Sequence, residues 1–99
     1  RPLAIPPAII IAKDSNLGRS QDTIVLRVRL LKVPSEGYLS ASLYLKANRS
    51  EKRVGEDSQL VTPNSSSLEF VFPEAKTGEY RAYLFWQGNI VRQFEFELE

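Results

Sequence analysis

The sequence predicts an all-β protein of seven short antiparallel strands packed as two sheets. Three observations lead to this fold class. Apolar and polar residues alternate along several stretches, which is the period of a strand with one buried face. No stretch of about ten residues or more keeps the three- and four-residue spacing of an amphipathic helix. Turn-forming residues separate the alternating stretches at short intervals, as in sandwiches and barrels.

The first two strands are expected at residues 8–12 and 23–33. Residues 8–12 form an isoleucine-rich run after two prolines, which suits a sheet edge because missing N–H donors are tolerated there. Residues 14–18 carry a turn signal. Residues 23–33 then alternate aliphatic side chains with Arg27 and Arg29, so the aliphatic face is the inner one.

The middle of the chain predicts two further strands and a polar connection. Residues 38–46 alternate leucine and alanine with tyrosine, serine and lysine, which indicates a half-buried strand. Residues 47–67 are mostly polar, and we expect loops there with one short edge strand at most. Residues 68–72 alternate again and end at Pro73.

The last two strands are expected to form a hairpin, at residues 80–86 and 90–98, around a three-residue loop at residues 87–89. This register was chosen because it brings large apolar side chains together on the inner face. The expected inner pairs are Tyr80 with Phe96, Ala82 with Phe94 and Trp86 with Ile90, and the outer pairs are Arg81 with Glu95 and Tyr83 with Gln93. One inner pair, Leu84 with Arg92, is a misfit. It requires Arg92 to reach water at the end of the sandwich or a β-bulge to intervene.

The segment Lys76-Thr77-Gly78-Glu79-Tyr80-Arg81-Ala82 resembles the D-x-G-x-Y-x-C corner of immunoglobulin-like domains. Together with the strand count, this resemblance implies an immunoglobulin-like or fibronectin type III-like sandwich with Greek-key connections. It also implies that Tyr80 is structural and that its hydroxyl bonds to backbone a few residues upstream, with Gly78 in the same corner. Lys76 and Ala82 depart from the motif, so an antibody-type domain is not implied.

The length of 99 residues predicts a single domain spanning residues 1–99. Residues 1–7 contain three prolines and suit a stiff connector to a preceding domain. Since the chain starts at Arg1, we expect it to be a piece of a larger protein, with an extracytoplasmic or cell-surface location slightly favoured.

Composition argues against several function classes. The chain has no cysteine or histidine, so we expect no thiol or imidazole catalysis, no zinc site, no cofactor and no enzyme activity. Thirteen basic and twelve acidic residues leave a net charge of +1, which argues against a nucleic-acid partner. The longest apolar run is too short for membrane insertion.

Several polar groups are expected to be solvated surface rather than sites. Glu56-Asp57 offers too few ligands for calcium. The alternating Glu95, Glu97 and Glu99 are expected to protect an outer strand face. Asn48 and Asn64 each begin an N-glycosylation triplet, and whether either is modified stays open.

The basic cluster of Arg49, Lys52 and Arg53 lacks interleaved aromatic residues, so a solvated loop is also expected there.

The expected outer face carries the main candidate for binding. In the register above, three apolar side chains point outward from the last hairpin, and two tyrosines of the third strand could join them. The candidate partner-binding residues are Tyr38, Tyr44, Tyr83, Phe85 and Val91. The sequence therefore favours a non-catalytic interaction or spacer module that contacts a partner or a neighbouring domain. The alternative is a carbohydrate-binding module attached to an enzyme, with the tyrosine rings stacking on sugars.

Overall fold

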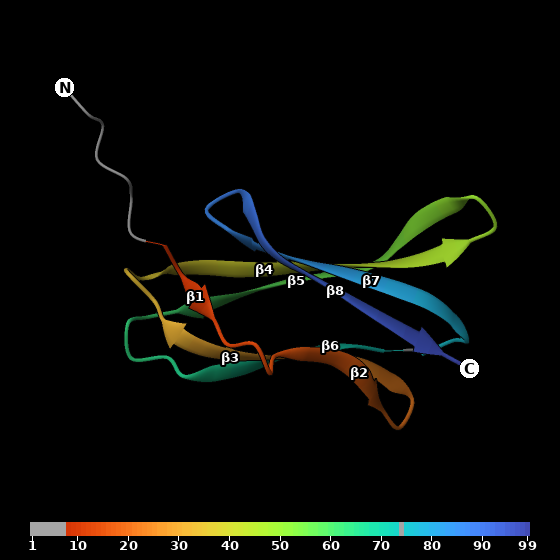
Figure 1. Cartoon of the computed structure of the whole chain (residues 1–99), viewed down its shortest axis with the longest axis horizontal. Helices are drawn as coiled ribbons and strands as arrows, with labels where there is room; N and C mark the ends of the chain where they lie inside the picture. Colours follow the sequence, from red (N-terminus) through yellow and green to blue (C-terminus); the bar gives the residue numbers. More distant parts are fainter. Residues whose placement is uncertain (1–7, 74) are drawn as a thin grey trace.

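The computed structural model describes residues 8–73 and 75–99. It is all-β within these residues, with two antiparallel sheets lying face to face as two layers (Figure 1). The eight strands are β1 Ile10–Ile11, β2 Asn16–Ser20, β3 Thr23–Lys32, β4 Gly37–Ala47, β5 Ser50–Val61, β6 Ser67–Phe72, β7 Gly78–Trp86 and β8 Asn89–Leu98. The connector expected at residues 1–7 lies outside the described residues.

The first sheet is built around β3, which pairs with β1, β2 and β6. The turn expected at residues 14–18 is shorter than predicted, and β2 begins at Asn16. Between β1 and β2, the Ala12 N–H donates to the Arg29 carbonyl over 2.8 Å, and the Ser15 hydroxyl accepts from the Arg29 N–H over 2.9 Å. These bonds keep β3 paired where the strand pairing itself is interrupted. β1 and β2 therefore act as two parts of one edge strand. This interruption explains why the structure has eight strands where seven were expected.

The second sheet has the order β5-β4-β7-β8. Its β5 corrects the expectation of loops over residues 47–67, because residues 50–61 form a twelve-residue strand along β4. Only Val61 of β5 is buried, so the strand leaves almost no apolar alternation in the sequence. The strand forms because its backbone pairs with β4. The turn that allows this pairing contains Asn48 in a left-handed conformation, with φ of 58°. The hairpin projects at one end of the molecule (Figure 1).

The core lies between the two sheets and is made of their inner faces. The largest fully buried side chains are Phe70, Ile24, Leu26, Leu39, Leu43, Leu84 and Val28. They come from β3, β4, β6 and β7, which are the strands whose alternation was clearest in the sequence. Ala82 and Phe94 are buried as predicted, and Phe96 is partly buried against the core.

The β7–β8 register is confirmed over most of its length and wrong at the turn. Tyr80 pairs with Phe96, Ala82 with Phe94 and Leu84 with Arg92, as do the outer pairs. Trp86, however, pairs with Asn89 and not with Ile90. The turn has two residues, Gln87 and Gly88, both with positive φ, and an extra residue in β8 restores the expected register beyond it.

A pair of hydrogen bonds resolves the Leu84–Arg92 misfit, because the bulge lies on the turn side of this pair and leaves Arg92 opposite Leu84. The Arg92 guanidinium donates to the Ile11 carbonyl over 2.8 Å and to the Ala12 carbonyl over 3.4 Å. Arg92 thus reaches across from β8 to the interrupted edge of the other sheet. Its guanidinium therefore donates to backbone carbonyls at the end of β1 and just after it.

The corner hydrogen bond expected for Tyr80 is present. The Tyr80 hydroxyl donates to the Lys76 carbonyl over 2.7 Å and accepts from the Lys76 N–H over 2.8 Å. Gly78 lies between them with φ of 142°, and a Cβ there would come within 2.7 Å of the Leu45 side chain. Both features hold the segment before β7 close to the second sheet.

Candidate functional site

The candidate site is the solvent-facing side of the second sheet. Paired residues in a sheet point to the same side, so the register identifies which side chains share this face. Ser40 pairs with Phe85, and Ser42 pairs with Tyr83. Because both serines lie on the outer face of β4, Phe85 and Tyr83 also point outward, as the sequence predicted.

Three aromatic rings meet in the middle of this face. The ring centroids of Tyr44 and Tyr83 are 5.6 Å apart with planes at 85°, an edge-to-face contact. Those of Tyr83 and Phe85 are 6.5 Å apart with planes at 41°. Ser42, which lies on the same face and pairs with Tyr83, is only 8% exposed. The three half-buried rings form a continuous apolar surface, here called the aromatic cluster.

Exposed apolar residues extend the aromatic cluster toward one end of the sheet. Tyr38 is 64% exposed, and Leu60, its partner on β5, is 52% exposed. Ile90, which pairs with Phe85, is also 52% exposed. Leu60 and Ile90 were not among the predicted binding residues. Leu60 lies in a segment expected as loop, and Ile90 was expected to be buried opposite Trp86.

Val91 is the predicted binding residue that the structure places elsewhere. It is partly buried and packs against the core cluster rather than joining Phe85 outside. The bulge in β8 explains the error, because one extra residue reverses the faces of Ile90 and Val91. Ile90 therefore takes the outward position that had been assigned to Val91.

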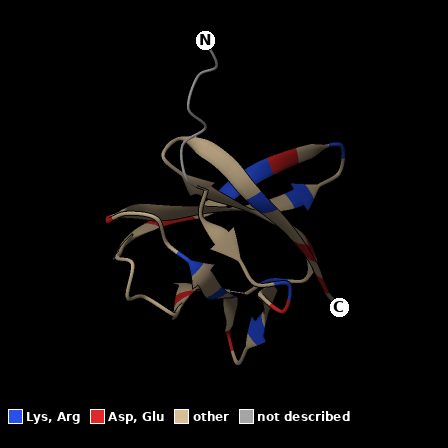
Figure 2. Cartoon of the chain, turned by 60° about the vertical axis from the view of Figure 1, so that its left-hand side comes forward, with Lys and Arg blue, Asp and Glu red and all other residues tan. Residues whose placement is uncertain are grey.

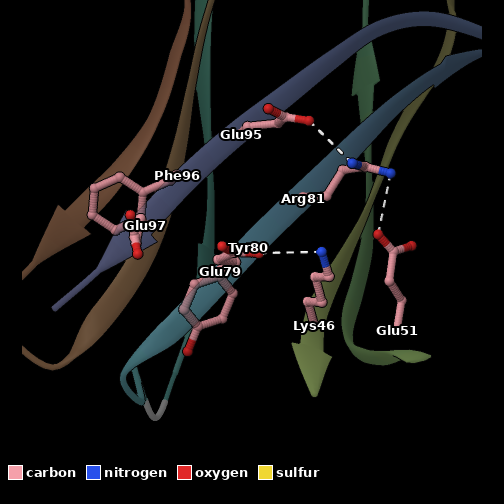
Figure 3. Close-up of a pocket in the computed structure, with 8 residues that line it drawn as sticks. All are labelled: Lys46, Glu51, Glu79, Tyr80, Arg81, Glu95, Phe96 and Glu97. Carbon is pink, nitrogen blue, oxygen red and sulfur yellow. Dashed lines mark hydrogen bonds and ion pairs between the residues drawn. The ribbon is translucent and has the colours of Figure 1, made fainter. Parts of the chain in front are cut away.

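The other half of the outer face is charged (Figure 3). Arg81 forms ion pairs of 3.1 Å with Glu51 and with Glu95, and Lys46 lies 3.6 Å from Glu79. The neighbouring Tyr83 hydroxyl and the charge of Glu51 raise the pKa of Arg81. A surface hollow of about 440 Å³ is lined by Lys46, Glu51, Glu79, Arg81, Glu95 and Glu97, together with Tyr80 and Phe96. Two cations, Lys46 and Arg81, face four carboxylates in this hollow, so it is a net acidic network of ion pairs beside the aromatic cluster.

The remaining polar candidates are distributed over exposed positions. Glu56, Asp57 and the basic cluster all lie on β5 or on the β4–β5 turn. Asn48 lies in that turn and Asn64 in the β5–β6 connection, and both are exposed. Lysine and arginine are interspersed with aspartate and glutamate on both sheets (Figure 2). Within residues 8–73 and 75–99, no three acidic side chains are grouped so that they could hold a metal ion.

The described part of the chain contains no helix long and apolar enough to cross a membrane. Comparisons with protein-family models, curated proteins and solved structures found no match to this chain.

Proposed function

We propose that this chain is a non-catalytic interaction or spacer module of a larger protein, which contacts a partner protein or a neighbouring domain through the aromatic cluster. The observation that carries the proposal is the cluster itself: Tyr44, Tyr83 and Phe85 pack together on the solvent side of a sheet. Tyrosine and phenylalanine are the residues that dominate binding energy in protein interfaces.

The cluster contributes little to the sandwich core. The buried side chains come from the inner faces of both sheets, and none of the three rings belongs to the core cluster. Tyr38, Leu60 and Ile90 widen the apolar surface, and the network around Arg81 borders it. An apolar centre with a charged margin is the usual arrangement of a protein interface.

The ring geometry supports a protein partner over a carbohydrate. Sugar stacking on several residues needs a flat platform, whereas the Tyr44 and Tyr83 planes are nearly perpendicular. The Tyr83 and Phe85 planes are also tilted by 41°. Edge-to-face rings give an uneven surface, which suits interdigitating protein side chains.

We also propose that the module has the immunoglobulin-like Greek-key fold. Two features support this assignment. The chain crosses between the two sheets from β3 to β4, from β5 to β6 and from β6 to β7, and β1 with β2 acts as one edge strand. The hydrogen bonds of Tyr80 to Lys76 are those of a tyrosine corner.

The first test separates interface residues from core residues. Phe94→Ala should lower the free energy of unfolding by about 3 to 5 kcal/mol because it opens a core cavity. Phe85→Ala should leave the isolated chain close to its original stability, since the ring lies outside the core cluster. Urea unfolding of both variants measures the difference. Equal destabilisation would make Phe85 a structural residue and remove the proposed interface.

The second test looks for the partner directly. A photo-cross-linking amino acid replaces Phe85 in the complete protein, and the products are identified by mass spectrometry. The matched control carries the same probe at Val71, which is 53% exposed on β6 of the other sheet. Cross-links to one defined segment from position 85 alone support the proposal. Similar products from both positions, or none from position 85, contradict it.

A further inference from the structure

The edge strand β5 is long and largely open, with the Gln59 side chain donating to the Glu69 carbonyl of β6 over 2.6 Å and the Ser58 N–H donating to the Asp57 carboxylate over 2.8 Å. It pairs with β4 along one side, and among the described strands no other pairs with it. Eleven of its twelve residues are exposed or half-exposed. An unpaired edge presents a row of N–H and C=O groups that can accept another strand.

The charges on β5 are arranged symmetrically. Lys52 and Arg53 precede the pair Val54-Gly55, and Glu56 and Asp57 follow it. If a second copy of β5 lies antiparallel to the first, centred on Val54-Gly55, Lys52 of one copy faces Asp57 of the other. Arg53 likewise faces Glu56. Opposite charges on directly opposed residues favour such a pairing. Segments with basic residues and segments with acidic residues both occur along the projecting β4–β5 hairpin (Figure 2).

A bulge makes this symmetry compatible with the faces of the sheet. In a regular strand, residues three apart point to opposite sides, and Arg53 could not face Glu56 in this register. In β5, an extra residue at Val54 interrupts the pairing with β4. As a result, Arg53 pairs with Tyr44 and Glu56 pairs with Ser42, both on the outer face. The 2.9 Å ion pair between Arg53 and Glu56 confirms that they share a side.

We infer that the chain self-associates through its β5 edge, as a two-fold dimer in which the two second sheets join into one eight-stranded sheet. Charges that merely protect an edge repel a second copy best when they have one sign. On β5, by contrast, two basic residues precede the centre of the strand and two acidic residues follow it. The two-fold axis is perpendicular to the joined sheet, so the aromatic clusters of both copies stay on the same side. The dimer is independent of the proposed function, because it uses a different surface.

Sedimentation equilibrium of the isolated chain tests this inference. Because the paired edge buries little surface, the dissociation constant should lie at roughly 10 to 500 µM. Two charge-reversed variants, K52E/R53E and E56K/D57K, should each raise it by about tenfold or more, since like charges then face each other. An equimolar mixture of the two variants should associate again, because each restores the opposite charges for the other.

The matched control is K13E/K32E, which changes two exposed lysines near the other sheet by the same total charge. It should dimerise as the unchanged chain does, and circular dichroism should show that all variants are folded. A chain that stays monomeric up to about 1 mM overturns the inference. So does association that survives in either β5 variant, or a mixture of the two that fails to associate. Loss of the dimer in F85A but not in the β5 variants would assign self-association to the aromatic cluster instead.

Discussion

At the scale of single residues, Tyr80 and Gly78 shape the corner that leads into β7. Tyr80 is 4% exposed, yet its hydroxyl both donates to and accepts from the backbone of Lys76. Gly78 lets the chain approach Leu45 more closely than any residue with a Cβ would allow. The corner before β7 therefore depends on one buried hydroxyl and one missing side chain.

Replacing Tyr80 with phenylalanine should lower the free energy of unfolding by about 1 to 3 kcal/mol, because the Lys76 N–H and carbonyl lose their partner. Tyr38→Phe is the matched control, since Tyr38 is 64% exposed. Urea unfolding compares the two variants. If Tyr80→Phe is as stable as the control, the corner hydrogen bond contributes nothing to folding.

At the scale of elements, the most consequential feature is the interrupted edge formed by β1 and β2. β1 has only two residues, and Arg92 of β8 donates to the carbonyl of its last residue, Ile11, and to that of the following Ala12. The guanidinium also lies 5.9 Å from the centre of the Phe94 ring. One side chain thus connects the edge of the first sheet to the edge of the second.

Replacing Arg92 with methionine should therefore cost about 1 to 3 kcal/mol of unfolding free energy, because it removes charge-assisted bonds to the Ile11 and Ala12 carbonyls. Hydrogen exchange at the Ala12 amide should quicken in the same variant. Arg27→Met is the control, since its ion pair with Glu69 is solvent-exposed and should be worth less than about 1 kcal/mol. Equal effects in the two variants would show that Arg92 does not hold the β1 edge.

At the scale of the whole molecule, stability comes from packing between the two sheets. The chain contains no cysteine and no histidine, so neither disulfides nor the nitrogen and sulfur ligands of zinc are present. The ion pairs of the described residues lie on the surface with substantial exposure of both partners, and such pairs contribute little individually. The buried aliphatic and aromatic side chains between the sheets are the main source of stability.

The thermal unfolding midpoint should accordingly stay the same in the presence of micromolar zinc or of a chelator. A metal that binds only the folded state raises the midpoint in a saturable manner. Among the described residues, no group of three potential ligands is close enough to hold an ion. Differential scanning calorimetry with and without zinc checks this expectation, and a saturable rise would reveal a site formed in some other way.

The sequence by itself determined the all-β class, the positions of the core strands and most of the β7–β8 register. These features depend on apolar alternation and on which side chains must be buried together. Ala82, Leu84 and Phe94 could be assigned to the core for that reason. The outward direction of Tyr83 and Phe85 followed from the same alternation.

The tertiary structure alone decided the rest, because the remaining features depend on backbone pairing rather than on burial. β5 has one buried residue in twelve, so its polar sequence resembled a loop until β4 paired with it. The bulges at Val54 and in β8 add single residues that no hydrophobic pattern records, and the latter exchanged the faces of Ile90 and Val91. The contact of Tyr44 with Tyr83 likewise required the alignment of two neighbouring strands, which local sequence does not encode.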